Sequence, residues 1–95
     1  MTPEGKVKAA VNRALTTLPN CYRFMPVQAG MGAPTLDYLV CVNGRFVAIE
    51  TKAPGKDLTP RQNVTWSEIS SAGGLCFLVD GPETLDYMMQ VLRKL

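Results

Sequence analysis

The sequence predicts an α/β protein with a mixed four-stranded sheet flanked by helices, and three observations support this prediction. Two β-prone segments, 36–42 and 45–52, are separated by Asn43-Gly44, a dipeptide typical of tight antiparallel hairpins. A continuous apolar run at 75–79 is typical of a strand covered on both faces. Segments with helical spacing of apolar residues stand at both ends of the chain and before this run.

The first expected element is a helix that ends before Pro19-Asn20. Thr2-Pro3-Glu4 has the order of an N-cap, a proline at the first helical position and an acid in the first turn. Apolar residues then recur on one face as far as Leu18. Residues 21–27 follow as a strand, in which Pro26 favours an edge position or a strand end.

A loop over residues 30–34 is expected to lead into the hairpin strands 36–42 and 45–52. The next helix is expected to open at Thr59-Pro60-Arg61-Gln62 and to close at Gly73-Gly74. The strand after it, 75–79, should lie parallel to 45–52, because a crossover helix joins the two.

Residues 80–83 then start a last helix whose apolar side chains form one stripe. The predicted order is helix, three strands, helix, strand and helix. We expect one domain over residues 1–95, because folded domains usually contain about 100 to 200 residues and no linker interrupts the chain.

Composition excludes several kinds of chemistry. The chain of 95 residues contains no histidine, which removes Ser-His and Cys-His nucleophile systems and zinc sites that need imidazole. Its three cysteines lie in apolar runs without a CxxC pair, which indicates buried thiols in a reducing cytoplasm. No apolar run is long enough to span a bilayer, and the first residues lack the apolar core of a signal peptide, so we expect a cytoplasmic protein without membrane contact.

The net charge of +2 is too small to indicate a polyanionic partner by itself. Its distribution is more informative, because eight of the ten Lys and Arg residues lie in residues 1–61 with only four of the eight acidic residues. Positive charge therefore accumulates in the first two thirds of the sequence.

Three charged residues are expected to meet at one end of the predicted hairpin. Glu50 and Lys52 project from the same face of their strand, because side chains alternate along a strand. Asp37 starts the preceding strand and therefore lies opposite the end of the next one. Since charges within apolar strands are costly unless they are paired or bind a metal, this arrangement indicates a functional site.

Two carboxylates and a backbone carbonyl, expected from Thr51, suit a hard divalent cation such as Mg²⁺. Such an ion polarises phosphoryl oxygens and lowers the pKa of a bound water, and a neighbouring lysine orients that water or stabilises developing negative charge. The set is suited to metal-assisted hydrolysis of phosphodiesters. The pattern of ExK with an upstream aspartate is weak alone, and its position at a strand end strengthens it.

The segments GMGAPTLDYLV and FVAIETKAPGKDLTPRQ, followed by a helix that ends in Gly-Gly, resemble the VRR-NUC branch of the PD-(D/E)XK nuclease superfamily, especially its small stand-alone forms from bacteriophages and bacteria. The resemblance covers nearly the whole chain. It implies a restriction-endonuclease-like αβββαβ core. It also implies Mg²⁺- or Mn²⁺-dependent cleavage of DNA by a homodimer that acts on branched, Holliday-junction-like substrates, in the cytoplasm of a bacterium or of a phage-infected host cell, without an organic cofactor.

By resemblance, Asp37 and Glu50 match the metal-binding acids of the family, Lys52 matches the lysine of the ExK element, and Gln62 the glutamine of the following helix. Glu4 resembles the glutamate that many relatives use on their first helix. The chain departs from the Pro-Asp doublet of the family, because two residues are inserted between Pro34 and Asp37.

Each of these candidate site residues also has a simpler, purely structural interpretation. Asp37 is also explained as an exposed strand start, and Glu50 and Lys52 as a surface ion pair. Gln62 also completes a capping box with Thr59, and Glu4 also suits a helix N-terminus. The basic residues of the first two thirds are also explained as a solvated surface, although two of them, Lys56 and Arg61, are placed to contact phosphates just beyond the site.

Two other functions remain open at this point. A non-catalytic nucleic-acid-binding module on the same fold would bind DNA without metal-dependent cleavage. A protein-interaction subunit would show no affinity for DNA even at low salt, where electrostatic binding is strongest.

Overall fold

A computed structural model describes residues 1–27 and 34–95 of the chain. The predicted loop over 30–34 lies outside the described residues except for Pro34. Three helices and four strands follow in the predicted order: α1 (Pro3–Leu15), β1 (Cys21–Phe24), β2 (Tyr38–Val42), β3 (Arg45–Thr51), α2 (Pro60–Ser71), β4 (Leu75–Val79) and α3 (Pro82–Leu92).

The strands form one mixed sheet in the order β1-β2-β3-β4. The first three are antiparallel neighbours, and β4 pairs parallel with β3, as the crossover by α2 requires. Asn43 and Gly44 join β2 to β3 with φ angles of 52° and 82°. Both residues have the left-handed backbone of a type I′ turn, so the hairpin expected from this dipeptide is confirmed.

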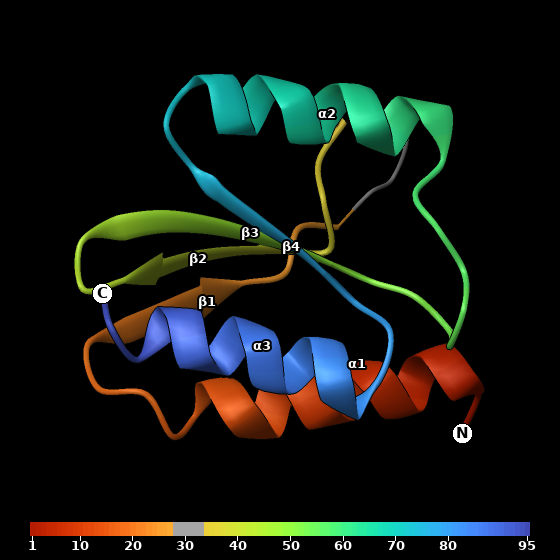
Figure 1. Ribbon diagram of the computed structural model, residues 1–95, viewed down its shortest axis with the longest axis horizontal. Helices are drawn as coiled ribbons and strands as arrows, with labels where there is room; N and C mark the ends of the chain where they lie inside the picture. The colour runs from red at the N-terminus through yellow and green to blue at the C-terminus, as the bar shows by residue number, and fades with distance from the viewer. Residues whose placement is uncertain (28–33) are drawn as a thin grey trace.

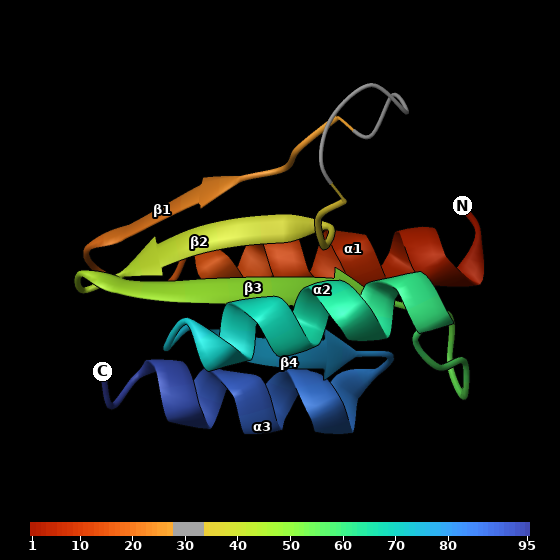
Figure 2. The same cartoon turned by 90° about the horizontal axis from the view of Figure 1, so that it is seen from above.

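Helices cover the sheet unequally on its two faces (Figure 1). Helices α1 and α3 lie side by side on one face, where alternate residues of β2 and β3, among them Tyr38, Val40 and Ile49, are buried against them. Helix α2 lies on the other face, over β3 and β4 (Figure 2), and buries only Thr65. The hydrophobic core therefore sits between the sheet and the α1–α3 pair.

In the part of the chain that the structure describes, no helix lies over the α2 face of β1 and β2 (Figure 2). Tyr22 and Phe24 of β1 lie on this face, beside Cys41 and Leu39 of β2 in the register of the two strands. Phe46 of β3 is the other neighbour of Cys41. Tyr22, Phe24 and Phe46 are 72%, 53% and 49% exposed. We call these three aromatic residues the exposed aromatic face.

Several predicted boundaries were too wide. Helix α1 ends at Leu15 instead of near Leu18, because the hydroxyls of Thr16 and Thr17 bond back to carbonyls of the last turn. Strand β1 ends at Phe24, two residues before Pro26, which has no N–H to donate to a strand ladder. Strand β2 begins at Tyr38 instead of residue 36.

Two expectations about burial also need correction. Strand β4 has helices on both sides, but as an edge strand it leaves Leu75, Cys76 and Leu78 only half-buried. The three thiols are free, and none of them is buried as expected: Cys21 and Cys76 are half-buried, and Cys41 is exposed because no helix of the described residues covers its face of β2. Within the described residues, no helix is both long and apolar enough to cross a membrane.

Met88 of α3 has no exposed surface and packs in the core. We expect Met88→Ala to lower the free energy of unfolding by about 2–5 kcal/mol, because it removes buried apolar contacts and leaves a cavity. Gln90→Ala is the matched control on the same helix, where the side chain is exposed and the loss should stay below about 0.5 kcal/mol. Denaturant unfolding measures both; equal losses would contradict this description of the core.

Candidate active site

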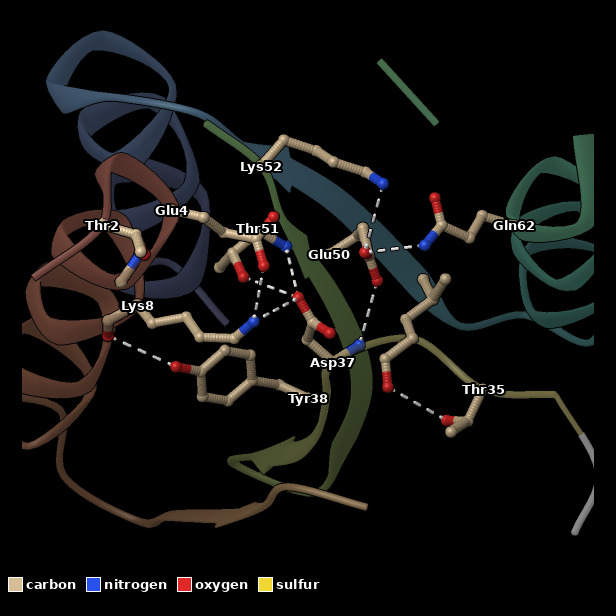
Figure 3. Close-up of polar contacts among 12 residues, drawn as sticks. Thr2, Glu4, Lys8, Thr35, Asp37, Tyr38, Glu50, Thr51, Lys52 and Gln62 are labelled. Carbon is tan, nitrogen blue, oxygen red and sulfur yellow. Dashed lines mark hydrogen bonds and ion pairs between the residues drawn. The ribbon is translucent and has the colours of Figure 1, made fainter. Parts of the chain in front are cut away.

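The register of the hairpin brings two carboxylates together. Tyr38 pairs with Ile49, so the preceding Asp37 lies beside Glu50 at the end of β3. The backbone N–H of Asp37 donates to Oε1 of Glu50 at 3.1 Å. The two residues inserted before Asp37 do not prevent this, and one of them, Leu36, is fully buried. The predicted convergence of Asp37 with the end of β3 is confirmed (Figure 3).

All hydrogen bonds that the carboxylate of Asp37 accepts from described residues go to one oxygen. Oδ2 accepts from the backbone N–H of Thr51 at 3.0 Å, from its hydroxyl at 2.6 Å and from the ammonium of Lys8 at 3.3 Å. Oδ1 is therefore the oxygen left to accept a ligand. Thr51 thus contacts the site through its hydroxyl and its N–H, whereas the predicted role of its carbonyl as a metal ligand stays a prediction.

Glu50 is a buried carboxylate, with only 3% of its surface exposed. Its Oε2 accepts from Nε2 of Gln62 at 2.9 Å and lies 3.7 Å from Nζ of Lys52. Burial, and next the negative charge of Asp37, raise the pKa of Glu50 to about 7. The hydrogen bond from Asp37 and the charges of Lys52 and Lys8 offset this only in part. A further positive charge would therefore stabilise ionised Glu50.

Gln62 caps helix α2 and also contacts a carboxylate of the site, whereas its catalytic role stays a prediction. Its backbone N–H donates to the hydroxyl of Thr59 and its Oε1 accepts from the Thr59 N–H, which completes the capping box of α2. Its Nε2 at the same time donates to Glu50. Because both ends of the amide are engaged, the start of α2 holds Glu50 in place.

Lys52 follows β3 directly, and its N–H continues the pairing with β4 by donating to the carbonyl of Val79 at 3.0 Å. Its side chain is 14% exposed and points with Glu50 toward the start of α2 (Figure 3). The ammonium is thus held close to Glu50 by a side chain that keeps a small exposed surface.

Lys8 is a site residue that the sequence analysis missed. Its ammonium lies between two carboxylates, 3.1 Å from Oε2 of Glu4 and 3.3 Å from Oδ2 of Asp37. Burial lowers the pKa of Lys8, but the bonds and charges of Glu4 and Asp37 outweigh this and leave the pKa raised. The i, i+4 spacing of Glu4 and Lys8 was the available signal, but it is equally typical of a surface ion pair.

The hydroxyl of Tyr38 anchors the same helix to the sheet. It is placed to donate to the carbonyl of Lys8 at 3.3 Å or to Oδ1 of Asn12 at 3.2 Å. Because Asp37 and Tyr38 are consecutive, the start of β2 contacts α1 through both the side chain and the backbone of Lys8.

The remaining candidates lie around this cluster. Glu4 contacts Lys8, and its role as a metal ligand stays a prediction. Lys56 lies exposed in the loop between β3 and α2, and Arg61 lies exposed in the first turn of α2 beside Gln62. Their contact with nucleic acid likewise stays a prediction.

The donor set suits a small, hard cation with several water ligands. It offers Oδ1 of Asp37 and the carboxylate of Glu50, whose ionised form is only partly compensated by nearby positive charge. Within residues 1–27 and 34–95, no three His, Cys, Asp or Glu side chains are grouped to hold a metal. Mg²⁺ usually binds proteins through one or two carboxylates together with substrate phosphates and several waters, and a pair of carboxylates fits this pattern.

Fold and site together define a mixed α/β domain that presents two carboxylates and a lysine at the end of its central hairpin. No protein-family model matches the sequence, and neither does any curated protein. A solved structure described as "VRR_NUC domain" is similar over 95% of this chain and 97% of its own length, with a TM-score of 0.81 and 20% sequence identity. The chain therefore has the fold of a VRR_NUC domain, as the sequence resemblance implied.

The raised pKa of Glu50 predicts an unusual dependence of stability on pH in the absence of divalent cations. The folded protein keeps the proton of Glu50 up to about pH 7, whereas the unfolded chain loses it near the ordinary value of 4.5. The free energy of unfolding should therefore fall between these pH values, by up to about 3 kcal/mol. No histidine titrates in this window. Urea unfolding in EDTA at pH 5 and pH 8 measures the fall.

Glu50→Gln should abolish this fall, because the amide does not ionise. Glu68→Gln, at an exposed position of α2, should keep it and serves as the control. A fall of the same size in Glu50→Gln would show that another group is responsible.

Proposed function

We propose that the protein is a metal-dependent endonuclease that hydrolyses phosphodiester bonds in DNA, with branched, Holliday-junction-like DNA as its substrate. The observation that carries the proposal is the meeting of Asp37, Glu50 and Lys52 at the end of β3. The VRR_NUC fold supports it, since these residues match the acidic and lysine positions of the nuclease motif that the sequence resembles.

In this proposal Asp37, Glu50 and the carbonyl of Thr51 would hold Mg²⁺, for which Mn²⁺ can substitute, and Glu4 is a further candidate ligand. A bound ion of this kind polarises a phosphoryl oxygen and lowers the pKa of a water molecule. Two observations support this assignment: Oδ1 of Asp37 accepts no hydrogen bond from the described residues, and the charge of Glu50 is only partly compensated. No organic cofactor is needed.

The protein's own groups would act as follows. Lys52 positions the attacking water or a phosphate oxygen, because its ammonium lies beside Glu50 and remains accessible. Gln62 positions Glu50 through its amide. In the reaction, the water oxygen bonds to phosphorus while the bond from phosphorus to one ester oxygen breaks. The water loses a proton and the leaving oxygen gains one.

Lys56 and Arg61 are proposed to contact DNA phosphates just beyond the site. Both are exposed, and they lie in the loop and in the helix turn that follow Lys52. Contacts of this kind hold the backbone of a nucleic acid without reading its sequence. They should make binding dependent on salt.

We also propose that the protein is a single domain that works as a homodimer in the cytoplasm of a bacterium or of a phage-infected host cell. One chain of 95 residues offers little surface to hold a four-way junction, and a two-fold dimer presents two sites to two strands. The exposed aromatic face offers an apolar surface for such an interface.

Cleavage of labelled DNA tests the proposed activity. We expect wild-type protein to cut a four-way junction in Mg²⁺ or Mn²⁺ but not in EDTA, and to cut linear duplex and flap DNA more slowly. Asp37→Asn and Lys52→Ala should each lower the rate at least about 100-fold, because Asp37 would hold the metal ion and Lys52 would position the attacking water or a phosphate oxygen. Asp86→Asn and Lys94→Ala, at exposed positions of the chain, are charge-matched controls and should keep the activity. Binding of DNA without cleavage in either metal would instead favour a non-catalytic module.

Sedimentation velocity tests the proposed dimer. Wild-type protein at micromolar concentration should sediment as a dimer, and Phe24→Ser should shift it toward the monomer because it removes apolar surface from the exposed aromatic face. Tyr87→Ser removes an aromatic side chain that is also more than half exposed, from α3, and should leave the dimer intact. A monomeric wild type, both free and bound to DNA, would contradict the dimer.

A further inference from the structure

Each of the two site carboxylates is paired with a different lysine. Glu50 lies near Lys52, which the nuclease motif includes, whereas Asp37 is paired with Lys8, which belongs to helix α1 and to no motif found in the sequence. Figure 3 shows the two ammonium groups approaching the carboxylates from different sides. Lys8 is therefore a permanent positive charge beside a proposed metal ligand, and it requires its own explanation.

Orientation of Asp37 does not explain the presence of Lys8. The N–H and hydroxyl of Thr51 already hold Oδ2 at 3.0 and 2.6 Å, both shorter than the 3.3 Å contact with Lys8. Attachment of α1 to the sheet does not explain it either. The helix is held by buried apolar residues and through the carbonyl of Lys8, which any side chain at this position would provide.

What Lys8 adds is charge. Its ammonium also contacts Oε2 of Glu4, at 3.1 Å, and this second carboxylate helps to keep it beside Asp37. The ammonium of Lys8 contacts Oδ2 of Asp37, whereas Oδ1 is the oxygen left for a ligand. A cation bound by Asp37 would thus be only a few ångströms from a fixed positive charge, and like charges at such distances repel each other.

We propose that Lys8 is a positioning residue that weakens the binding of free divalent cations to Asp37 and Glu50, so that the site retains a cation firmly only when a phosphate group adds negative charge. This inference rests on the proposed function, because it concerns the metal of that site. Lys8 acts through Asp37 and has no contact with the reacting atoms in this assignment.

The test measures binding of Mn²⁺ in the absence of DNA, by electron paramagnetic resonance of the free ion, at pH 8. Lys8→Met should tighten binding by about tenfold, because it removes the repulsion but keeps the bonds from Thr51 to Asp37. Lys8→Arg keeps the charge and should bind Mn²⁺ as the wild type does. Lys6→Met removes the same charge from an exposed position of the same helix and should also match the wild type.

A second readout uses cleavage. The Mg²⁺ concentration that gives half-maximal cleavage should fall in Lys8→Met and stay unchanged in Lys6→Met. Circular dichroism confirms that each variant is folded before either measurement.

The outcomes separate this inference from the proposed function. Equal or weaker Mn²⁺ binding by Lys8→Met, in a protein that still binds Mn²⁺ and cuts DNA, would overturn the inference alone. The same tightening in Lys8→Arg or in Lys6→Met would overturn it too, because the effect would then not depend on a charge at this position. Absence of Mn²⁺ binding and of cleavage in both the wild type and Lys8→Met would overturn the proposed function and the inference with it.

Discussion

Glu50 is a carboxylate that the fold buries at the end of its central strand, and the surrounding contacts compensate for the loss of water around it. Buried charge is tolerated only where hydrogen bonds and opposite charges replace solvent. Here the N–H of Asp37, the amide of Gln62 and the ammonium of Lys52 do so, each from a different segment of the chain. The compensation is incomplete, since the pKa of Glu50 remains about 7. A positive charge bound beside Glu50 would therefore stabilise both its ionised form and the folded protein above about pH 7.

The two carboxylates are compensated by helices that lie on opposite faces of the sheet. Helix α2 begins with a capping box whose glutamine also reaches Glu50, so the start of the helix and the position of the carboxylate depend on one side chain. Helix α1 brings Lys8 to Asp37 from the other face (Figure 3). Two carboxylates and two ammonium groups therefore meet at the end of β3, one lysine coming from α1 and the other directly following the strand.

The sequence predicted the element order, the parallel fourth strand and the meeting of Asp37 with the end of β3, because these follow from local signals. A left-handed Asn-Gly turn sets the hairpin register, and that register alone places Asp37 beside Glu50. The sequence was less successful at element ends, where side-chain hydroxyls and sheet edges compete with regular structure. The prediction that Cys41 is buried was wrong, because apolar neighbours in the sequence do not reveal which face of the sheet lacks a helix.

The sequence by itself determined which residue types were available, namely carboxylates, lysines and no histidine, and thus the kind of chemistry open to the protein. It also determined their spacing along the strands, because side-chain alternation is a local property of the backbone. Only the tertiary structure decided that Lys8 belongs to the site, that Gln62 serves both the helix and Glu50, and that the charge of Glu50 is disfavoured. Contacts between residues 29 positions apart, such as Lys8 and Asp37, and the removal of water from a side chain arise only when separate elements pack together.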